Sequence, residues 1–284
     1  MTRPIVPSTL RPLAAALLLL ASAPAAAQLL GTASSFAVLG ATPSVTNVGP
    51  SVVSGSVGVW PALSITGFPP GLVVPGTGAL NPGDATAQQA QTDTTAAYLA
   101  LAGRVSAPIA PALGGQTLTP GTYNAGAANL TGTLTLNGPG LYVIQATALT
   151  TASGPAASSV SLINGATACD LWWQVGSSAT IGTFSAMQGN ILALTSITIA
   201  TSASLNGRAL ARNGTVTLDS NAITACTGGS TPGFIVPGAS APPPPPSSAQ
   251  PTPTLSEWAM IVLALLVLAV GFAGMRRRTG WEKR

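Results

Sequence analysis

The sequence predicts a mainly β protein, a β-solenoid with one long α-helix packed alongside it. Short segments alternate aliphatic and hydroxyl residues, these segments recur at a nearly constant interval, and a single segment has helical periodicity. Of the 284 residues only 6% are charged, 46% are hydrophobic and none is His. Such a composition is typical of a rigid exported protein, and it argues against a disordered polyelectrolyte.

The repeat is clearest in the stretch GNILALTSITIATSASLNGRALARNGTVTLDSN. Gly189 and Gly207 are 18 residues apart, and Ile199 and Leu218 are 19 apart. Two looser rows are LYVIQATALTTASG and LWWQVGSSATIGT. A period of this length suits one coil of a β-solenoid. A β-sandwich is the rival fold, and the regular spacing disfavours it.

Alternation along each row assigns an inside and an outside. Ala179 and Ile181 flank Thr180, and equivalent pairs of aliphatic residues flank Thr198 and Thr217. The aliphatic side chains are expected to fill the tube, and the threonines to form a ladder outside it. Threonines on neighbouring strands of the ladder would lie about 4.8 Å apart. Hydroxyl residues two positions apart on the same strand would lie about 6.6 Å apart.

The helix is predicted over Asn81–Arg104. Asp84 is a suitable N-cap, and Gly103 ends the helix. Small or apolar residues recur at spacings of three and four: Ala87, Ala90, Thr94, Ala97, Tyr98 and Leu101. Because most of this stripe is small, the helix can lie close along the flank of the β segments.

The two ends of the chain carry targeting signals. Residues 1–27 have the basic, apolar and small-residue regions of a secretory signal peptide, with a cut expected near Ala27; an uncleaved membrane helix is the alternative. Trp258–Met275 is an uncharged 18-residue segment followed by an Arg-rich end, which predicts a transmembrane helix with that end in the cytoplasm. The solenoid domain is expected over residues 28–229, and a Pro-rich linker over residues 230–254.

The motif PTLSEW at the head of the last segment resembles bacterial C-terminal sorting signals of the IPTL type. The resemblance covers about the last thirty residues and implies recognition by a sorting protease in a Gram-negative envelope; the sorting signal and anchor are expected over residues 255–284. A plain membrane anchor is the alternative. The protein is therefore expected in the cell envelope or at the cell surface, with release after processing of the tail also open.

Cys169 and Cys226 are the two cysteines, and an exported protein favours a disulfide between them. A catalytic thiol would need a base, and the chain has no imidazole to supply one. We expect the bond to close a loop of about 57 residues and to stabilise the domain.

Charge and composition exclude several classes of function. The formal net charge is +4, yet between residues 28 and 250 three arginines oppose four aspartates. The excess positive charge therefore lies at the two ends of the chain, and no nucleic-acid partner is expected. The four aspartates are dispersed, and general acid/base catalysis needs a positioned group. Arg208 and Arg212 are expected to bond loop carbonyls. No enzyme activity, cofactor or metal is predicted.

An uncharged hydroxyl ladder suits an ordered surface better than a small ligand. Each Thr offers a hydroxyl and a methyl group, and a rigid backbone fixes their spacing at little entropic cost on binding. That Thr is simply a good strand residue is the structural alternative. The predicted ladder is Thr135, Thr150, Thr180, Thr198 and Thr217, with Ser178, Ser196 and Thr215 as a second column.

From Leu30 to Thr224 the sequence resembles the bacterial and fungal ice-binding protein family. The segments that carry the resemblance occur in order, and include LGTASSFAVLG, DATAQQAQTDTTAAYLALAGR, LTGTLTLNG, WQVGSSATIGT and NGRALARNGTVTLDSN. The resemblance implies a discontinuous right-handed β-helix with one helix alongside. It also implies adsorption to ice through one flat face without a cofactor, which slows ice growth and recrystallisation. The Thr-Ala/Gly-x-Thr/Asn pattern of some members is only approximated here, at Thr195–Thr198.

The alternative function is a structural or adhesive envelope module that binds a polysaccharide or a protein. An exposed platform of Trp60, Trp172 or Trp173 would support it. Strand alternation predicts instead that Trp172 and Trp173 point to opposite sides of their strand.

The protein is expected to be a monomer.

Overall fold

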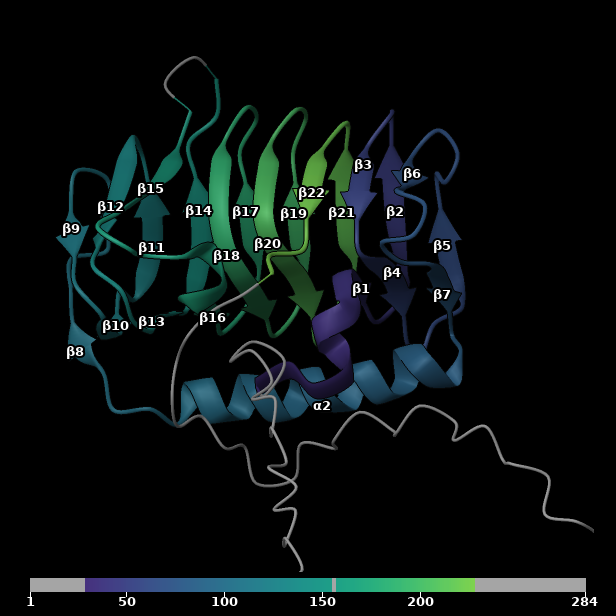
Figure 1. The fold of residues 1–284 in the computed structure, drawn as a ribbon, viewed down its shortest axis with the longest axis horizontal. Helices are drawn as coiled ribbons and strands as arrows, with labels where there is room; N and C mark the ends of the chain where they lie inside the picture. The colour runs from purple at the N-terminus through teal and green to yellow at the C-terminus, as the bar shows by residue number, and fades with distance from the viewer. Residues whose placement is uncertain (1–28, 155–156, 228–284) are drawn as a thin grey trace, which may run out of the picture. The chain divides into compact units, whose positions relative to one another are not determined.

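The computed structural model describes residues 29–154 and 157–227 of the 284-residue protein. Figure 1 shows the strands stacked side by side, with the helix α2 (Ala85–Ala102) running along the stack. The predicted signal peptide, Pro-rich linker and sorting tail lie outside the described residues. Among the described residues, no helix combines the length and the apolar character needed to cross a membrane.

The strands form a solenoid with three faces, and every pairing between named strands is parallel. This excludes the rival β-sandwich, whose sheets are antiparallel. A 15-stranded sheet folds around one edge of the solenoid to give faces A and C, and a separate seven-stranded sheet is face B.

Face A contains β1 (Phe36–Gly40), β4 (Ser56–Val59), β7 (Leu80–Pro82), β8 (Ala107–Pro108), β10 (Gly121–Asn124), β13 (Tyr142–Ala146), β16 (Leu171–Val175) and the second halves of β18 (Ala186–Ala193) and β20 (Ser204–Ala211). Face B contains β2 (Ser44–Val48), β5 (Ser64–Thr66), β11 (Ala127–Leu130), β14 (Ala148–Thr151), β17 (Ala179–Ile181), β19 (Ile197–Ile199) and β21 (Val216–Asp219). Face C contains β3 (Val52–Ser54), β6 (Leu72–Val73), β9 (Thr117–Leu118), β12 (Thr133–Asn137), β15 (Ser159–Ile163), β22 (Ala222–Thr224) and the first halves of β18 and β20. Two short 3-10 helices, η1 (Gly31–Ser35) and η2 (Ala168–Asp170), complete the described elements.

The order of the coils along the stack differs from their order in the chain. The first coil, β1 to β3, pairs with the last one, β20 to β22, strand for strand. After β7, α2 carries the chain to the other end of the stack, where β8 and β9 begin the remaining coils (Figure 1). The solenoid is therefore discontinuous, and each face combines residues from both ends of the domain.

Residues that are one predicted repeat apart in the sequence pair with each other on neighbouring strands of the stack. Gly189 pairs with Gly207, and Ile199 pairs with Leu218. The two glycines lie where β18 and β20 turn from face C to face A, with φ of +95° and +153°. A Cβ at Gly207 would lie 1.8 Å from the carbonyl oxygen of Gly189, so the edge between faces A and C requires glycine there.

Two apolar layers hold the domain together. The first fills the tube, and the second lies between face A and α2. Trp173 belongs to the first layer and Trp172 to the second, as strand alternation predicts.

The helix is confirmed with its predicted ends. Asp84 caps it by accepting a hydrogen bond from the Ala87 amide at 2.8 Å, and Gly103 follows its last residue. All six residues of the predicted stripe are buried, and α2 contacts strands of face A.

Polar side chains that the sequence did not single out fasten this helix. From β13, Gln145 donates hydrogen bonds to the carbonyl oxygens of Leu101 at 2.8 Å and Arg104 at 3.0 Å. Asp93 accepts from both the amide and the hydroxyl of Thr32, each at 2.7 Å. Terminal helix carbonyls have no partner within the regular helix, and Gln145 supplies a buried side-chain donor to them, in addition to the Arg104 N–H that reaches the Leu101 carbonyl at 3.3 Å.

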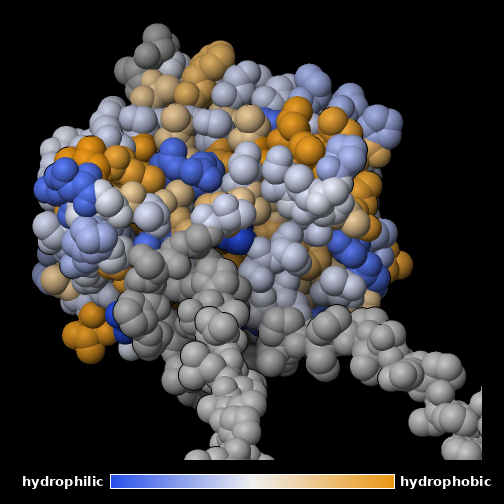
Figure 2. Space-filling model, in the orientation of Figure 1, coloured by the Kyte–Doolittle hydropathy of each residue, from blue (hydrophilic) through white to orange (hydrophobic). Residues whose placement is uncertain are grey.

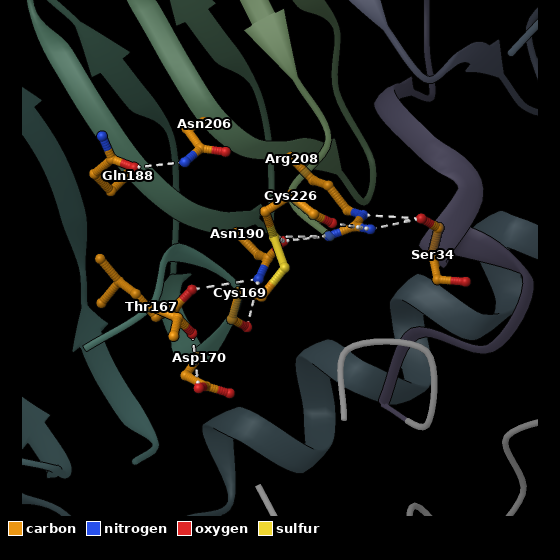
Figure 3. Close-up of a disulfide and its surroundings, with 10 residues drawn as sticks. Ser34, Thr167, Cys169, Asp170, Gln188, Asn190, Asn206, Arg208 and Cys226 are labelled. Atoms are coloured by element: carbon orange, nitrogen blue, oxygen red, sulfur yellow. Dashed lines mark hydrogen bonds between the residues drawn. A yellow bond between two sulfur atoms is a disulfide. The ribbon is translucent and has the colours of Figure 1, made fainter. Parts of the chain in front are cut away.

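The predicted disulfide is present at the edge between faces A and C (Figure 3). It joins Cys169 in η2 to Cys226 after β22, which are 57 residues apart in sequence. Arg208 lies beside it with 4% of its surface exposed, and donates to the Ser34 carbonyl at 2.7 Å and to Asn190 Oδ1 at 2.9 Å. Burial lowers the pKa of Arg208 to about 10, so at neutral pH a full charge is held there by neutral acceptors.

We predict that Gln145→Leu lowers the free energy of unfolding by about 1–3 kcal/mol, because the carbonyls at the end of α2 lose buried donors. Gln145→Glu is expected to cost more at neutral pH, because its carboxylate faces the negative end of the helix. Denaturant unfolding followed by circular dichroism measures both. Gln174→Leu, at the position paired with Gln145 on β16, is the matched control. Equal losses in Gln145→Leu and the control would contradict this role.

The double variant Cys169→Ala/Cys226→Ala is expected to lose about 2–4 kcal/mol of stability, because the 57-residue loop is no longer closed in the unfolded chain. For a domain of this size the melting midpoint should fall by roughly 5–15 °C. Thermal unfolding of the oxidised protein and the variant tests this. An unchanged midpoint would show that the bond does not constrain the fold.

Candidate functional site

Face B carries a continuous column of short polar side chains. Parallel pairing places seven residues at the same register across its seven strands: Asn129, Thr150, Thr180, Thr198, Thr217, Thr46 and Thr66. The residues on either side of Thr198, Ile197 and Ile199, are buried in the tube. The threonines therefore point outward, and we call this column the threonine ladder.

A second column runs beside the ladder, two residues earlier on each strand. It consists of Ala127, Ala148, Ser178, Ser196, Thr215, Ser44 and Ser64. Two of its hydroxyls are bonded to neighbouring groups: Thr215 donates to the Ser44 carbonyl at 2.6 Å, and the Ser178 hydroxyl lies 2.7 Å from that of Thr195, a residue outside the column. These bonds fix hydroxyl positions that would otherwise rotate freely.

The ladder is accessible, uncharged and rigidly held. Thr66, Thr150 and Thr180 are exposed, and Thr198 and Thr217 are half-buried by their neighbours. The helix α2 packs on face A and leaves face B uncovered. Figure 2, in the orientation of Figure 1, shows orange, pale and blue residues mixed over the side of the molecule that it displays.

Such a face can order water rather than bind a compact ligand. Strand spacing repeats a hydroxyl and a methyl group at about 4.8 Å along the stack, and the two columns lie about 6.6 Å apart. The side chains of both columns stand on a backbone that strand pairing already holds in place. Contact with a flat, ordered partner therefore costs little conformational entropy.

Seven of the eight residues proposed from sequence meet on this face. Thr150, Thr180, Thr198 and Thr217 lie in the ladder, and the other three lie in the second column. Thr135 does not. It lies on β12 in face C, where it pairs with Ser161 and Thr117. The assignment of Thr135 was wrong because alternation separates inside from outside but does not say which of three outer faces a strand occupies.

Three ladder residues were missing from the predicted set: Thr46, Thr66 and Asn129. Alternation in SVTN already placed Thr46 outside the tube, but Thr46 and Thr217 are 171 residues apart. Their hydroxyls lie 3.4 Å apart only because the first coil docks on the last. Stacking order, which alternation does not encode, was the missing information.

Other candidate groups have structural roles. Arg208 donates to carbonyls of Ser34 and Cys226, as predicted, whereas Arg212 donates to the Thr95 hydroxyl on α2 and lies over the Tyr98 ring, 5.5 Å from its centre. Within the described part of the chain, no three His, Cys, Asp or Glu side chains gather into a possible metal site.

The tryptophans do not form the exposed platform that a sugar-binding module would use. Trp172 and Trp173 are buried, at 2% and 0% exposure. Trp60 is half-buried against the layer under α2. These three tryptophans therefore do not support the alternative function, binding of a polysaccharide.

Comparison with known proteins agrees with this architecture. The sequence matches the ice-binding-like family over residues 39–224 and the IPTL-CTERM motif over residues 250–277. An ice-binding protein of Nostoc sp. (strain HG1) is 47% identical over 209 residues, which cover 70% of this chain and 75% of that protein.

Solved structures share the fold. The crystal structure of an ice binding protein from an Antarctic biological consortium has a TM-score of 0.65 at 38% identity, and the match covers 79% of this chain and 96% of that one. The ice-binding protein of the Antarctic ascomycete Antarctomyces psychrotrophicus gives a TM-score of 0.64 at 40% identity, covering 70% and 98%. With its three-faced parallel solenoid, flanking helix and matching sequence, this chain belongs to the ice-binding-like family.

Proposed function

We propose that this protein binds ice through face B, and that the threonine ladder and the column beside it form the contact. Adsorption there slows the growth and recrystallisation of ice. The observation that carries the proposal is the ladder itself, six threonines and one asparagine in register on a face away from α2, the long helix of the described residues.

The chemistry of the ladder supports ice over a dissolved ligand. Threonine hydroxyls can hold water at fixed positions, and their methyl groups disfavour disordered hydration between those positions. Neither column contains a charged side chain, so contact of the two columns with a solid dehydrates no ion within them. Asp219, at the end of β21, lies outside both columns and accepts a hydrogen bond from the Thr201 hydroxyl. The similar proteins from Nostoc sp., the Antarctic consortium and Antarctomyces psychrotrophicus carry ice binding in their names, which agrees with this assignment.

The protein is proposed to act outside the cytoplasm, at the cell surface or released from it. The IPTL-CTERM motif supports export and C-terminal sorting. The apolar segment Trp258–Met275 would anchor the chain in the membrane until a sorting protease acts.

Thr198→Tyr is predicted to reduce thermal hysteresis and inhibition of ice recrystallisation severalfold. Thr198 lies in the middle of the ladder, and a ring that stands out from the face prevents flat contact with ice. Both activities are measured on the full chain at equal concentration. Thr135→Tyr makes the same change on face C and should retain them.

The melting midpoint of each variant shows whether the fold is intact. Full activity in a folded Thr198→Tyr protein would move the ice-binding face elsewhere on the solenoid. Absence of activity in the parent protein as well would refute ice binding altogether.

Thr46→Tyr is predicted to reduce activity as Thr198→Tyr does, because Thr46 continues the ladder across the junction between the first and last coils. Thr224→Tyr, on β22 in face C, is the control. Ice recrystallisation assays on both variants test whether the first coil contributes to the contact. Retained activity in Thr46→Tyr would limit the contact to the rungs from Asn129 to Thr217.

A further inference from the structure

The chain leaves the solenoid on the side opposite the threonine ladder. A three-faced solenoid has three edges, and the edge between faces A and C is the one that does not border face B. The strands β18 and β20 cross this edge at Gly189 and Gly207. Thr224 of β22 pairs with Asn206, so the residues after it run parallel to β20 toward the same edge.

Covalent and polar contacts fix the exit point there. Cys226 is 6% exposed and is bonded to Cys169. Arg208, buried beneath it, donates to the Cys226 carbonyl at 3.1 Å and to its sulfur at 3.2 Å (Figure 3). Cys226 also packs in the apolar layer between face A and α2, not in the layer behind face B. At the end of the described part of the chain, its path is thus held away from the ladder.

The segment after Thr227 has the composition of a tether. Thirty residues, rich in Pro, Gly, Ser and Thr, separate Thr227 from the apolar segment at Trp258. Fully extended, 30 residues span at most about 100 Å. The IPTL-CTERM motif covers residues 250–277. A flat surface that meets face B therefore approaches from the side opposite the one where this tether begins.

We propose that the protein has a second function while its tail is still attached, which is to fasten the cell that displays it to ice. The proposal rests on ice binding by face B and adds that binding and anchoring use opposite sides of one domain. Freely dissolved protein slows crystal growth, whereas the anchored form holds a much larger body against the crystal.

The first experiment displays the full chain on Gram-negative cells and measures the fraction of cells recovered with a slowly growing ice hemisphere. Cells with the parent chain or with Thr135→Tyr should be recovered in the ice. Cells with Thr198→Tyr, displayed in equal amount, should be recovered no more than cells without the protein. Recovery of parent-chain cells at that background level would overturn anchoring.

A second experiment tests the side of attachment. The full chain is purified in detergent with one added cysteine, either Ala239→Cys beyond the exit point or Asn213→Cys between β20 and β21, at the edge between faces A and B. Asn213 is exposed, and biotinylation at each position is quantified by mass spectrometry without reduction of the Cys169–Cys226 bond. Streptavidin beads loaded to equal density are then offered to growing ice.

Beads held through Cys at position 239 should enter the ice, and beads held through position 213 should stay at the level of bare beads, because a bead there covers the ladder. Equal recovery of the two would overturn the role of the exit geometry. Thermal hysteresis of both biotinylated chains before bead attachment separates the two proposals. Active chains whose beads fail at position 239 refute anchoring alone, whereas inactive chains refute ice binding itself.

Discussion

Parallel pairing of β2 with β21 is the contact on which the rest of the structure depends. It joins the first coil of the chain to the last, and extends the ladder from Thr217 to Thr46 and then to Thr66. The same docking aligns β1 with β20 and β3 with β22. Side chains alternate along a strand, so a slip of one residue in this pairing would turn the outward threonines of two coils into the tube. The ladder would then be shorter, and fewer residues would contact a flat surface.

The polar side chains that stabilise the stack and the side chains of the two columns lie on different sides of it. The charged and long polar side chains that secure it, Arg208, Gln145 and Asp93, lie on the side of face A and α2. Face B keeps only short neutral side chains in its two columns. This separation keeps the buried guanidinium away from the ladder. Face B does carry Asp219, two residues after Thr217 on β21, and there the Thr201 hydroxyl donates a hydrogen bond to its carboxylate.

The sequence predicted the repeating part of the fold correctly because a solenoid is built from local regularity. Each strand shows its inside and outside by alternation, and the spacing from Gly189 to Gly207 is the length of one coil. The helix could be predicted equally well, since its cap Asp84, the terminating Gly103 and the stripe of small residues are local signals. The residues that fasten the helix could not be predicted, because Gln145 and Asp93 bond to partners 44 and 61 residues away.

By itself, then, the sequence determined the parallel coils, the flanking helix, the disulfide and most of the ladder, because each comes from short-range pattern or from a choice between two cysteines. Only the tertiary structure decided which outer face each strand occupies and in what order the coils stack. Those two facts removed Thr135 from the site and added Thr46, Thr66 and Asn129. They depend on the docking of chain segments about 170 residues apart, where backbone pairing in a given register, rather than any local residue pattern, selects the partner.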